Sequence, residues 1–373
     1  MALVLNEEQV MLKDAARNFL RENAPVSHLR ELRDSGNSDG FSRTLWMEIV
    51  DMGWTAILIP EEYGGLGYGY TGMGIVLEES GRTLTPSPLL GTALIGVAAL
   101  TLAGSETQCA RLLPDVAGGQ HLLALACDES SRHQPGTIAT RSEAQQNGFR
   151  LQGRKTAVLD GHVADTFIVS ATTASGVSLF LVPADSQGVS VESYPVFDTH
   201  AAANVAFEQV ALPEDSLLGA LHGGKDELDD ILDVARIGAA CEMLGIAREV
   251  FERTLQYLKD RKQFGVPIGS FQALQHRAAH LFSELEMCKS LVLKALQSLD
   301  ENPRGNMELA SLAKAKLCQT AHTAATEAIQ MHGGIGMTDD LDIGFFMKRC
   351  KFLETLYGDR LFHLDRYARI RGY

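Results

Sequence analysis

The stretch RKQFGVPIGSFQ, residues 261–272, separates two segments that have the hydrophobic periodicity of long α-helices. A short connection that carries Gly and Pro is typical of antiparallel neighbours in a helical bundle, and Ser270 is placed to cap the second helix. The sequence therefore predicts a C-terminal four-helix bundle over residues 219–373. One face of the second helix is apolar, and its members are Phe271, Leu274, Ala278, Leu281, Leu285, Cys288 and Val292.

Three side chains of this connection suit an anionic, planar ligand. Arg261 offers a planar fork for phosphate oxygens, Phe264 offers a ring on which a base can rest, and Gln272 offers a bidentate amide. An ordinary helical hairpin is the simpler explanation of the same residues. Taken alone, the connection therefore favours the hairpin over a binding site.

A glycine-rich turn ends the next long helix. Its sequence is QMHGGIG, residues 330–336, and it follows a segment rich in alanine. Gly333 and Gly334, which follow Gln330 in this motif, both stop the helix and bring bare backbone close to a neighbour. A nucleotide is one candidate neighbour, and a helix C-cap without a ligand is the alternative.

The chain upstream of the bundle divides into two further parts. Residues 1–119 have helical periodicity and begin with a cap at Asn6 to Gln9. Residues 120–218 consist of short β-rich runs between Gly, Ser, Asn and Pro turns, which predicts a small antiparallel barrel or sandwich. The expected fold class is α+β and multidomain: an N-terminal helical domain, a middle antiparallel β-domain and a C-terminal bundle.

The composition excludes several classes of partner. The 33 Lys and Arg residues against 47 Asp and Glu residues give a net charge of -14, which repels nucleic acid and anionic membranes alike. The apolar stretch at residues 89–102 is too short to span a bilayer, and the N-terminus has no export signal. Six scattered cysteines are interpreted as reduced core thiols, without a metal site. We expect a soluble, cytoplasmic protein.

The two glycine-containing motifs, in this order, resemble the C-terminal bundle of acyl-CoA dehydrogenases. They have the forms R-x-x-F-G-x-x-I-x-x-F-Q and Q-x-H-G-G-x-G. The likeness extends to a P-x-x-Y-G-G-x-G turn at residues 60–67, and to L-x-G-x-K at 151–155 and G-x-x-A-D at 161–165. The turn at 60–67 lacks the spacing and the βαβ setting of a phosphate loop, so it is interpreted as a tight turn. Each motif is weak by itself, but their joint order is specific.

The resemblance implies FAD-dependent oxidation of an acyl-CoA thioester to the 2-enoyl thioester. In that family a carboxylate removes the α-proton while hydride passes from the β-carbon to the flavin. The flavin ring lies between the β-domain and the bundle, and a neighbouring subunit holds the adenine half of the cofactor. Carried over to this sequence, the residues that bind FAD are Arg261, Phe264, Gln272, Gln330, Gly333 and Gly334.

Both positions that hold the catalytic glutamate in the family are occupied by other residues. Where many members have Tyr-Glu-Gly-Thr, this chain has Leu356-Tyr357-Gly358-Asp359, and where a second group has Glu before Arg, it has Ala235-Arg236. Glu242 lies seven residues after Ala235 on nearly the same helix face and is the best remaining candidate for the base. Its carboxylate has two explanations: catalysis with a raised pKa, or a structural pairing with a buried Arg or a helix N-terminus.

The loop that faces the flavin ring in the family also differs, because T-E-P-x-x-G-S-D is replaced by DESSRHQP at residues 128–135. A chain that keeps the residues for the far end of FAD, but not those for its ring, resembles the smaller subunit of heteromeric acyl-CoA dehydrogenases acting on steroid side chains or dicarboxylic acyl chains. The alternatives are therefore a self-sufficient homotetramer that uses Glu242, a heterotetramer with a larger homologous subunit, and a flavoprotein of this fold without thioester chemistry.

Overall fold

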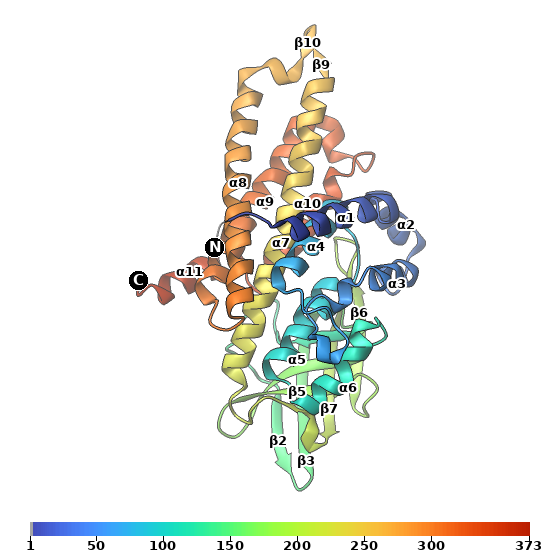
Figure 1. Ribbon diagram of the computed structural model, residues 1–373, viewed down its shortest axis with the longest axis vertical. Coiled ribbons are helices and arrows are strands. Elements are labelled where there is room, and N and C mark those ends of the chain that lie inside the picture. Colours follow the sequence, from blue (N-terminus) through green and yellow to red (C-terminus); the bar gives the residue numbers. More distant parts are fainter. Residues whose placement is uncertain (1–2) are drawn as a thin grey trace.

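The computed structural model describes residues 3–373 and has three parts in chain order (Figure 1). Helices form the first part, a sheet the second and long helices the third, so the expected fold class is confirmed. Helix gives way to strand between Ala117 and Leu123, and strand gives way to helix between Leu218 and Gly224. None of the described helices is both long enough and apolar enough to cross a lipid bilayer.

The first helix starts where the sequence predicts. The Gln9 backbone N–H donates to Asn6 Oδ1 at 2.8 Å, and the Asn6 N–H donates to Gln9 Oε1 at 3.0 Å, which is a capping box. The apolar stretch near residue 90 forms a π-helical segment, Leu89–Gly96, that is buried throughout. The helices of this part are α1 (Glu7–Asn23), α2 (Val26–Ser35), α3 (Arg43–Asp51), α4 (Tyr70–Thr83), α5 (Val97–Ala103) and α6 (Glu106–Ala117).

The P-x-x-Y-G-G-x-G segment forms a tight turn that leads into helix α4. A Cβ added at Gly65 would lie 1.9 Å from the Ile59 carbonyl oxygen, so the turn needs glycine there. The N-terminus of α4 is capped by a side chain from helix α8 (Gln272–Glu301). Asp300 of α8 accepts hydrogen bonds from the backbone N–H groups of Tyr70 and Thr71. A carboxylate at a helix N-terminus is stabilised by the helix dipole. The turn therefore packs the N-terminal part against the bundle.

Helix α4 crosses helix α7 (Gly224–Asp260) at very short range. A Cβ at Gly245 would lie 1.8 Å from the Glu78 carbonyl oxygen, and a Cβ at Gly81 would lie 2.2 Å from that of Glu242. Glycine at both positions is therefore required for this contact. The crossing carries the first half of α7, including Glu242, into the centre of the molecule.

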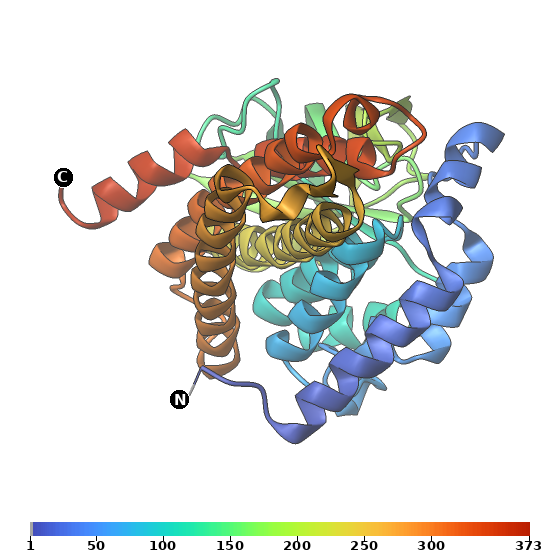
Figure 2. The same cartoon turned by 90° about the horizontal axis from the view of Figure 1, so that it is seen from above.

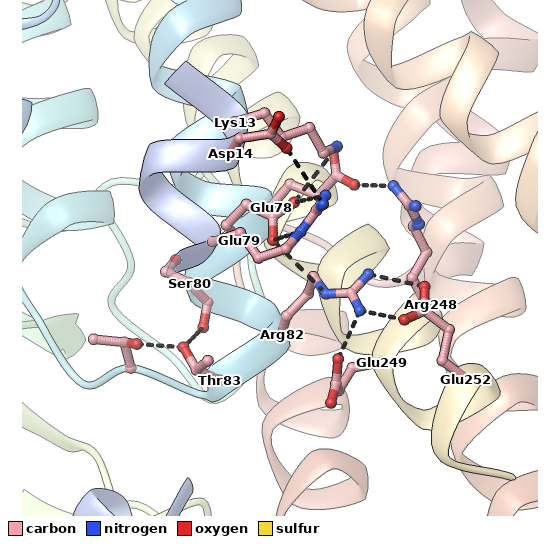
Figure 3. A network of polar contacts seen from close by, with 12 residues as sticks. Lys13, Asp14, Glu78, Glu79, Ser80, Arg82, Thr83, Arg248, Glu249 and Glu252 are labelled. Atoms are coloured by element: carbon pink, nitrogen blue, oxygen red, sulfur yellow. Dashed lines mark hydrogen bonds and ion pairs between the residues drawn. The ribbon is translucent and has the colours of Figure 1, made fainter. Parts of the chain in front are cut away.

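Charged side chains join α1, α4 and α7 beside this crossing (Figure 3). Glu78 accepts from Lys13 at 2.8 Å and from Arg248 at 2.6 Å, while Arg82 pairs with Glu249 at 2.9 Å and also with Glu252. Arg82 and Glu78 are buried, and buried charges are stable only when they are paired. The network thus holds the N-terminal helices in register with α7.

The middle part is one eight-stranded sheet in the order β6-β7-β3-β2-β4-β5-β8, with β1 on β4. Most neighbours are antiparallel, but β1 and β2 both run parallel to β4, which the expectation of an antiparallel domain did not include. Its apolar interior, with Phe167, Phe180 and Phe207, is separate from the main core. The strands are β1 (Leu123–Ala126), β2 (Arg141–Gln145), β3 (Gly148–Leu159), β4 (Thr166–Thr172), β5 (Val177–Pro183), β6 (Val189–Pro195), β7 (Ala201–Leu212) and β8 (Leu217–Leu218).

The third part is a bundle whose long helices project beyond the rest of the chain (Figure 1), and Figure 2 shows this bundle from its projecting end. Helices α7 and α8 are joined by a hairpin of β9 (Lys262–Gln263) and β10 (Val266–Pro267) at its tip. They are followed by α9 (Met307–His332), α10 (Ile343–Thr355) and α11 (Arg360–Ile370). The prediction that Ser270 caps α8 is wrong. Phe271 occupies the N-cap position, and the Ser270 hydroxyl donates to the Pro267 carbonyl instead. All six cysteines are buried and free, as expected.

Candidate functional site

The six residues expected to bind FAD lie on the projecting end of the bundle. Tyr257 joins their two segments: its ring lies 4.3 Å from the His332 ring, and its hydroxyl donates to the His332 carbonyl at 3.3 Å. The end of α7 is therefore packed on the end of α9. All six residues are solvent-exposed in this chain, namely Arg261, Phe264, Gln272, Gln330, Gly333 and Gly334.

Phe264 is held outward by an unfavourable backbone conformation. It has φ 50 and is followed by Gly265 with φ 81, which makes a two-residue hairpin turn of the primed type. A positive φ is uncommon for a bulky aromatic residue, and this ring is 92% exposed. An exposed, strained aromatic at a hairpin tip indicates a surface for a partner. Gly333 and Gly334 also face open space, since a Cβ on either would meet nothing within 4 Å.

A second feature is a crevice between the β-domain and the bundle. Its volume is about 760 Å³, which is large enough for a planar three-ring group. It lies where the family resemblance puts the flavin ring, between the loop that replaces T-E-P-x-x-G-S-D and the turn that replaces Tyr-Glu-Gly-Thr. Its lining is mixed, with polar and apolar surface in similar amounts, and comprises Ser131, Arg132, His133, Gln134, Pro135, Gly136, Thr137, Thr355, Gly358, Asp359, Leu361, Phe362, Asp365 and Arg369.

His133 lines this crevice, and each of its ring nitrogens lies within hydrogen-bonding distance of a charged side chain. Its Nδ1 lies 2.9 Å from both Asp128 carboxylate oxygens, and its Nε2 lies 3.0 Å from Arg236 Nη2. Because the guanidinium only donates, Nε2 accepts and Nδ1 carries the proton to Asp128. Burial lowers the pKa of His133. Cys127 lies beside this pair, but with both ring nitrogens engaged His133 has no lone pair for a metal ion.

Tyr357 occupies the position of the family's catalytic glutamate. It is 4% exposed, and two buried cations fix its turn: Arg236 Nε donates to the Tyr357 carbonyl at 3.1 Å, and Lys314 Nζ donates to the Gly358 carbonyl at 2.9 Å. Burial raises the pKa of Tyr357 well above its usual range. The side chain is therefore a neutral phenol at physiological pH and does not replace a carboxylate base.

Glu242 is buried and fully paired. Arg349 of α10 donates to its two carboxylate oxygens at 2.6 and 3.1 Å, and to Asp198 at 3.0 Å. A bidentate arginine–carboxylate pair occupies both carboxylate oxygens, so neither is free to meet a substrate. Of the two explanations for Glu242, this geometry favours the structural pairing.

Asp160 is a further carboxylate at the junction of the three parts. It ends strand β3 with φ 55, and its Oδ2 atom is buried without a hydrogen-bond partner. A Cβ on Gly91 of the π-helical segment would lie 2.4 Å from this oxygen. Burial raises the pKa of Asp160 to about 7, opposed by the nearby charges of His200 and Arg349 and assisted by Glu242.

The sequence motifs predicted to bind FAD are exposed in the structure, but the buried partners of Glu242 were not predicted. Arg349, Asp198 and Asp160 belong to none of the motifs, and Arg349 is 107 residues from Glu242 in the chain. The sequence offered one general signal, because a carboxylate in an apolar helix needs a cation as its partner. Nothing in one sequence identifies which of its arginines meets that need.

Three family models match consecutive parts of this chain. They describe the N-terminal domain of acyl-CoA dehydrogenase at residues 6–120, its middle domain at 125–210 and its C-terminal domain at 223–370. The probable acyl-CoA dehydrogenase YngJ of Bacillus subtilis is 29% identical over 363 residues, which cover 94% of each chain.

Two solved structures extend the likeness to the whole fold. The Tcur3481–Tcur3483 steroid ACAD is 30% identical, with 98% of both chains covered and a TM-score of 0.89. The ChsE4–ChsE5 complex of Mycobacterium tuberculosis is 25% identical over the full length of both chains, with a TM-score of 0.91. The chain therefore belongs to the acyl-CoA dehydrogenase family of FAD-dependent oxidoreductases.

Proposed function

We propose that this chain works as the cofactor-completing subunit of a heteromeric acyl-CoA dehydrogenase. It presents Arg261, Phe264 and the Gln330 glycine turn to the adenosine and diphosphate of FAD bound by a larger homologous subunit. The partner supplies the carboxylate that removes the α-proton of the acyl-CoA. The observation that carries the proposal is Tyr357, a buried phenol where the base is expected, on a turn whose backbone carbonyls accept from Arg236 and Lys314.

The distribution of exposed and committed groups supports this division of labour. Within residues 3–373, Arg261 makes no ion pair and the aromatic contact of Phe264 is an edge-on contact with Phe271. Phe264 is 92% exposed and Arg261 is also exposed, so both can meet a ligand on another chain. The carboxylate of Glu242, in contrast, is occupied by Arg349. Each of the two solved structures is named after two proteins, one pair as a complex and the other as a steroid ACAD, which supports a heteromeric assembly.

FAD, when bound, supplies the hydride acceptor, and the residues of this chain bind and orient it. Arg261 is suited to two phosphate oxygens because its guanidinium presents parallel N–H donors. Phe264 offers a flat apolar surface for adenine. The bare backbone at Gly333 and Gly334 permits a close approach that a side chain would prevent.

The proposal predicts that Arg261→Gln and Phe264→Ala each weaken FAD binding by the assembled enzyme. We expect an increase in the FAD dissociation constant of roughly 10- to 100-fold, as befits the loss of one charge-assisted contact or one aromatic contact of about 1–3 kcal/mol. Flavin release from the co-purified complex, followed by flavin fluorescence, measures the change.

Arg154→Gln is the matched control, because Arg154 is exposed on strand β3 of the other domain. The FAD dissociation constant of the complex that carries Arg154→Gln should equal that of the parent complex. Thermal unfolding should be nearly unchanged in all three variants, since exposed side chains contribute little to stability. Unchanged flavin affinity in both Arg261→Gln and Phe264→Ala would contradict the adenosine half-site.

A second candidate is a homo-oligomer in which the chain also holds the flavin ring. The crevice of about 760 Å³ favours this candidate, because its size suits the ring. Such an enzyme needs its own base, and Glu242 is then required to leave Arg349. The flavin content of the chain purified alone separates the two candidates.

A further inference from the structure

An acidic segment follows the glycine turn directly. It is TDDLD, residues 338–342, and it begins four residues after Gly334. A cavity of about 360 Å³ opens between the two, lined among others by Gly336, Asp339 and Phe345. Carboxylates beside a diphosphate repel it unless cations compensate them. FAD at its proposed position therefore requires that the negative charge of this segment be compensated.

Helix α2, which comes from the N-terminal domain, supplies two of these cations. Arg33 donates to both carboxylate oxygens of Asp339 at 2.9 and 3.1 Å, and Arg30 donates to Asp342 at 2.9 Å. Both arginines also lie over the Phe345 ring, with their guanidinium carbons 4.5 and 5.0 Å from its centroid. Planar contacts of this kind fix the direction of the segment as well as its charge.

A third arginine reaches the same segment from helix α7. Arg253 donates to the second oxygen of Asp342 at 3.1 Å, and its guanidinium carbon lies 5.1 Å from the centroid of the Phe346 ring. Asp342 is thus held between two cations from two domains. We name Arg30, Arg33 and Arg253 together the arginine clamp.

We propose that the arginine clamp is a positioning device for the cofactor. It turns the Asp339 and Asp342 carboxylates toward α2 and α7 and neutralises them, so that the glycine turn accepts the FAD diphosphate. The inference rests on the proposed adenosine half-site. It gives the N-terminal domain a part in binding FAD, although its two clamp residues, Arg30 and Arg33, do not touch the cofactor.

The expected effect follows from Coulomb's law. Two uncompensated carboxylates at a separation on the order of 10 Å from a doubly charged diphosphate weaken binding roughly five- to tenfold in water at low ionic strength. Because the Debye length falls from about 30 Å at 0.01 M to about 3 Å at 1 M salt, the deficit should fade as salt is added. A purely structural role for the arginines predicts no such fading.

The test uses the double variant Arg30→Gln/Arg33→Gln in the flavin-containing complex, with FAD as the probe. Its FAD dissociation constant should exceed the parent's five- to tenfold in 20 mM salt and by less than twofold in 0.5 M salt. Adding Asp339→Asn and Asp342→Asn should restore the parental value in low salt. If the double variant does not assemble, Arg33→Gln alone gives the same comparison with a smaller change.

Arg43→Gln is the matched control, because Arg43 also pairs with a carboxylate and lies over a ring, namely Asp39 and Phe41, but on helix α3. It should leave FAD affinity unchanged. Equal affinity of clamp variant and parent, or a deficit that persists in high salt and in the asparagine background, overturns the inference. Arg261→Gln in the same assay separates a failure of the clamp from a failure of the half-site. If Arg261→Gln weakens FAD binding and the clamp variant does not, only the clamp inference is wrong. If neither variant weakens FAD binding, the proposed half-site itself is wrong.

Discussion

Arg349→Met is expected to destabilise the protein by about 3–5 kcal/mol, because it leaves two buried carboxylates without their cation. Arg349 is 5% exposed and pairs with Glu242 and Asp198. Methionine has a similar length but cannot donate, so both charges keep their desolvation cost and lose their partner. For a chain of this size the loss corresponds to a melting temperature lower by about 4–6 °C, which calorimetry measures.

Removing one of the orphaned charges should restore part of this stability. The double variant Arg349→Met/Glu242→Gln is therefore expected to melt above Arg349→Met. Arg111→Met is the control, since Arg111 forms an exposed pair with Asp215 at 3.4 Å and such pairs contribute at most about 1 kcal/mol. An Arg349→Met protein as stable as its parent would mean that Glu242 is not held by this pair, and would reopen its assignment as a base.

Asp160→Asn is expected to change the pH dependence of stability. The folded protein raises the pKa of Asp160 to about 7, whereas an unfolded aspartate has a pKa of about 3.9. The folded state therefore keeps a proton that the unfolded state has released, so stability is highest below pH 4, falls between pH 4 and pH 7 and stays low above it. Asparagine remains neutral throughout, and it tolerates the positive φ of this position.

The informative quantity is the difference in unfolding free energy between variant and parent at two pH values. This difference should move in favour of Asp160→Asn by on the order of 2–4 kcal/mol from pH 4.5 to pH 8.5. Any constant cost of burying the amide cancels. Asp185→Asn, at an exposed position after strand β5, should show no such movement. A difference that is the same at both pH values would contradict a buried, protonated Asp160.

The sequence predicted those elements whose stability is local or whose faces are strongly patterned. The capping box at Asn6, the apolar face of α8 and the runs that became β1, β4 and β5 all carry their signal within a few residues. Strands β2 and β6 gave no such signal because they are largely exposed, as in RSEAQ and VSVESYP. They form because β2 hydrogen-bonds to the edge of β3 and β6 hydrogen-bonds to the edge of β7.

The site was predictable only as far as it faces outward. Arg261, Phe264 and the glycines of residues 333–334 stand in compact sequence patterns, and in the proposed function they meet a ligand rather than the rest of the chain. Arg349 and His133, in contrast, meet Glu242 and Arg236 through tertiary packing, over separations of 107 and 103 residues in the sequence. The burial of Asp160 likewise results from packing between domains. Pairing over such distances depends on the whole fold, so spacing within a motif does not reveal it.

The flavin-to-protein ratio of the purified chain is the most direct test of the account. The chain expressed alone should hold almost no FAD and should not reduce a dye with acyl-CoA, because Tyr357 occupies the position of the base without its carboxylate and the proposed adenosine half-site faces outward. Co-expression with a larger homologous subunit should restore both flavin and turnover. One FAD per chain in the protein purified alone would contradict the account and favour a self-sufficient enzyme.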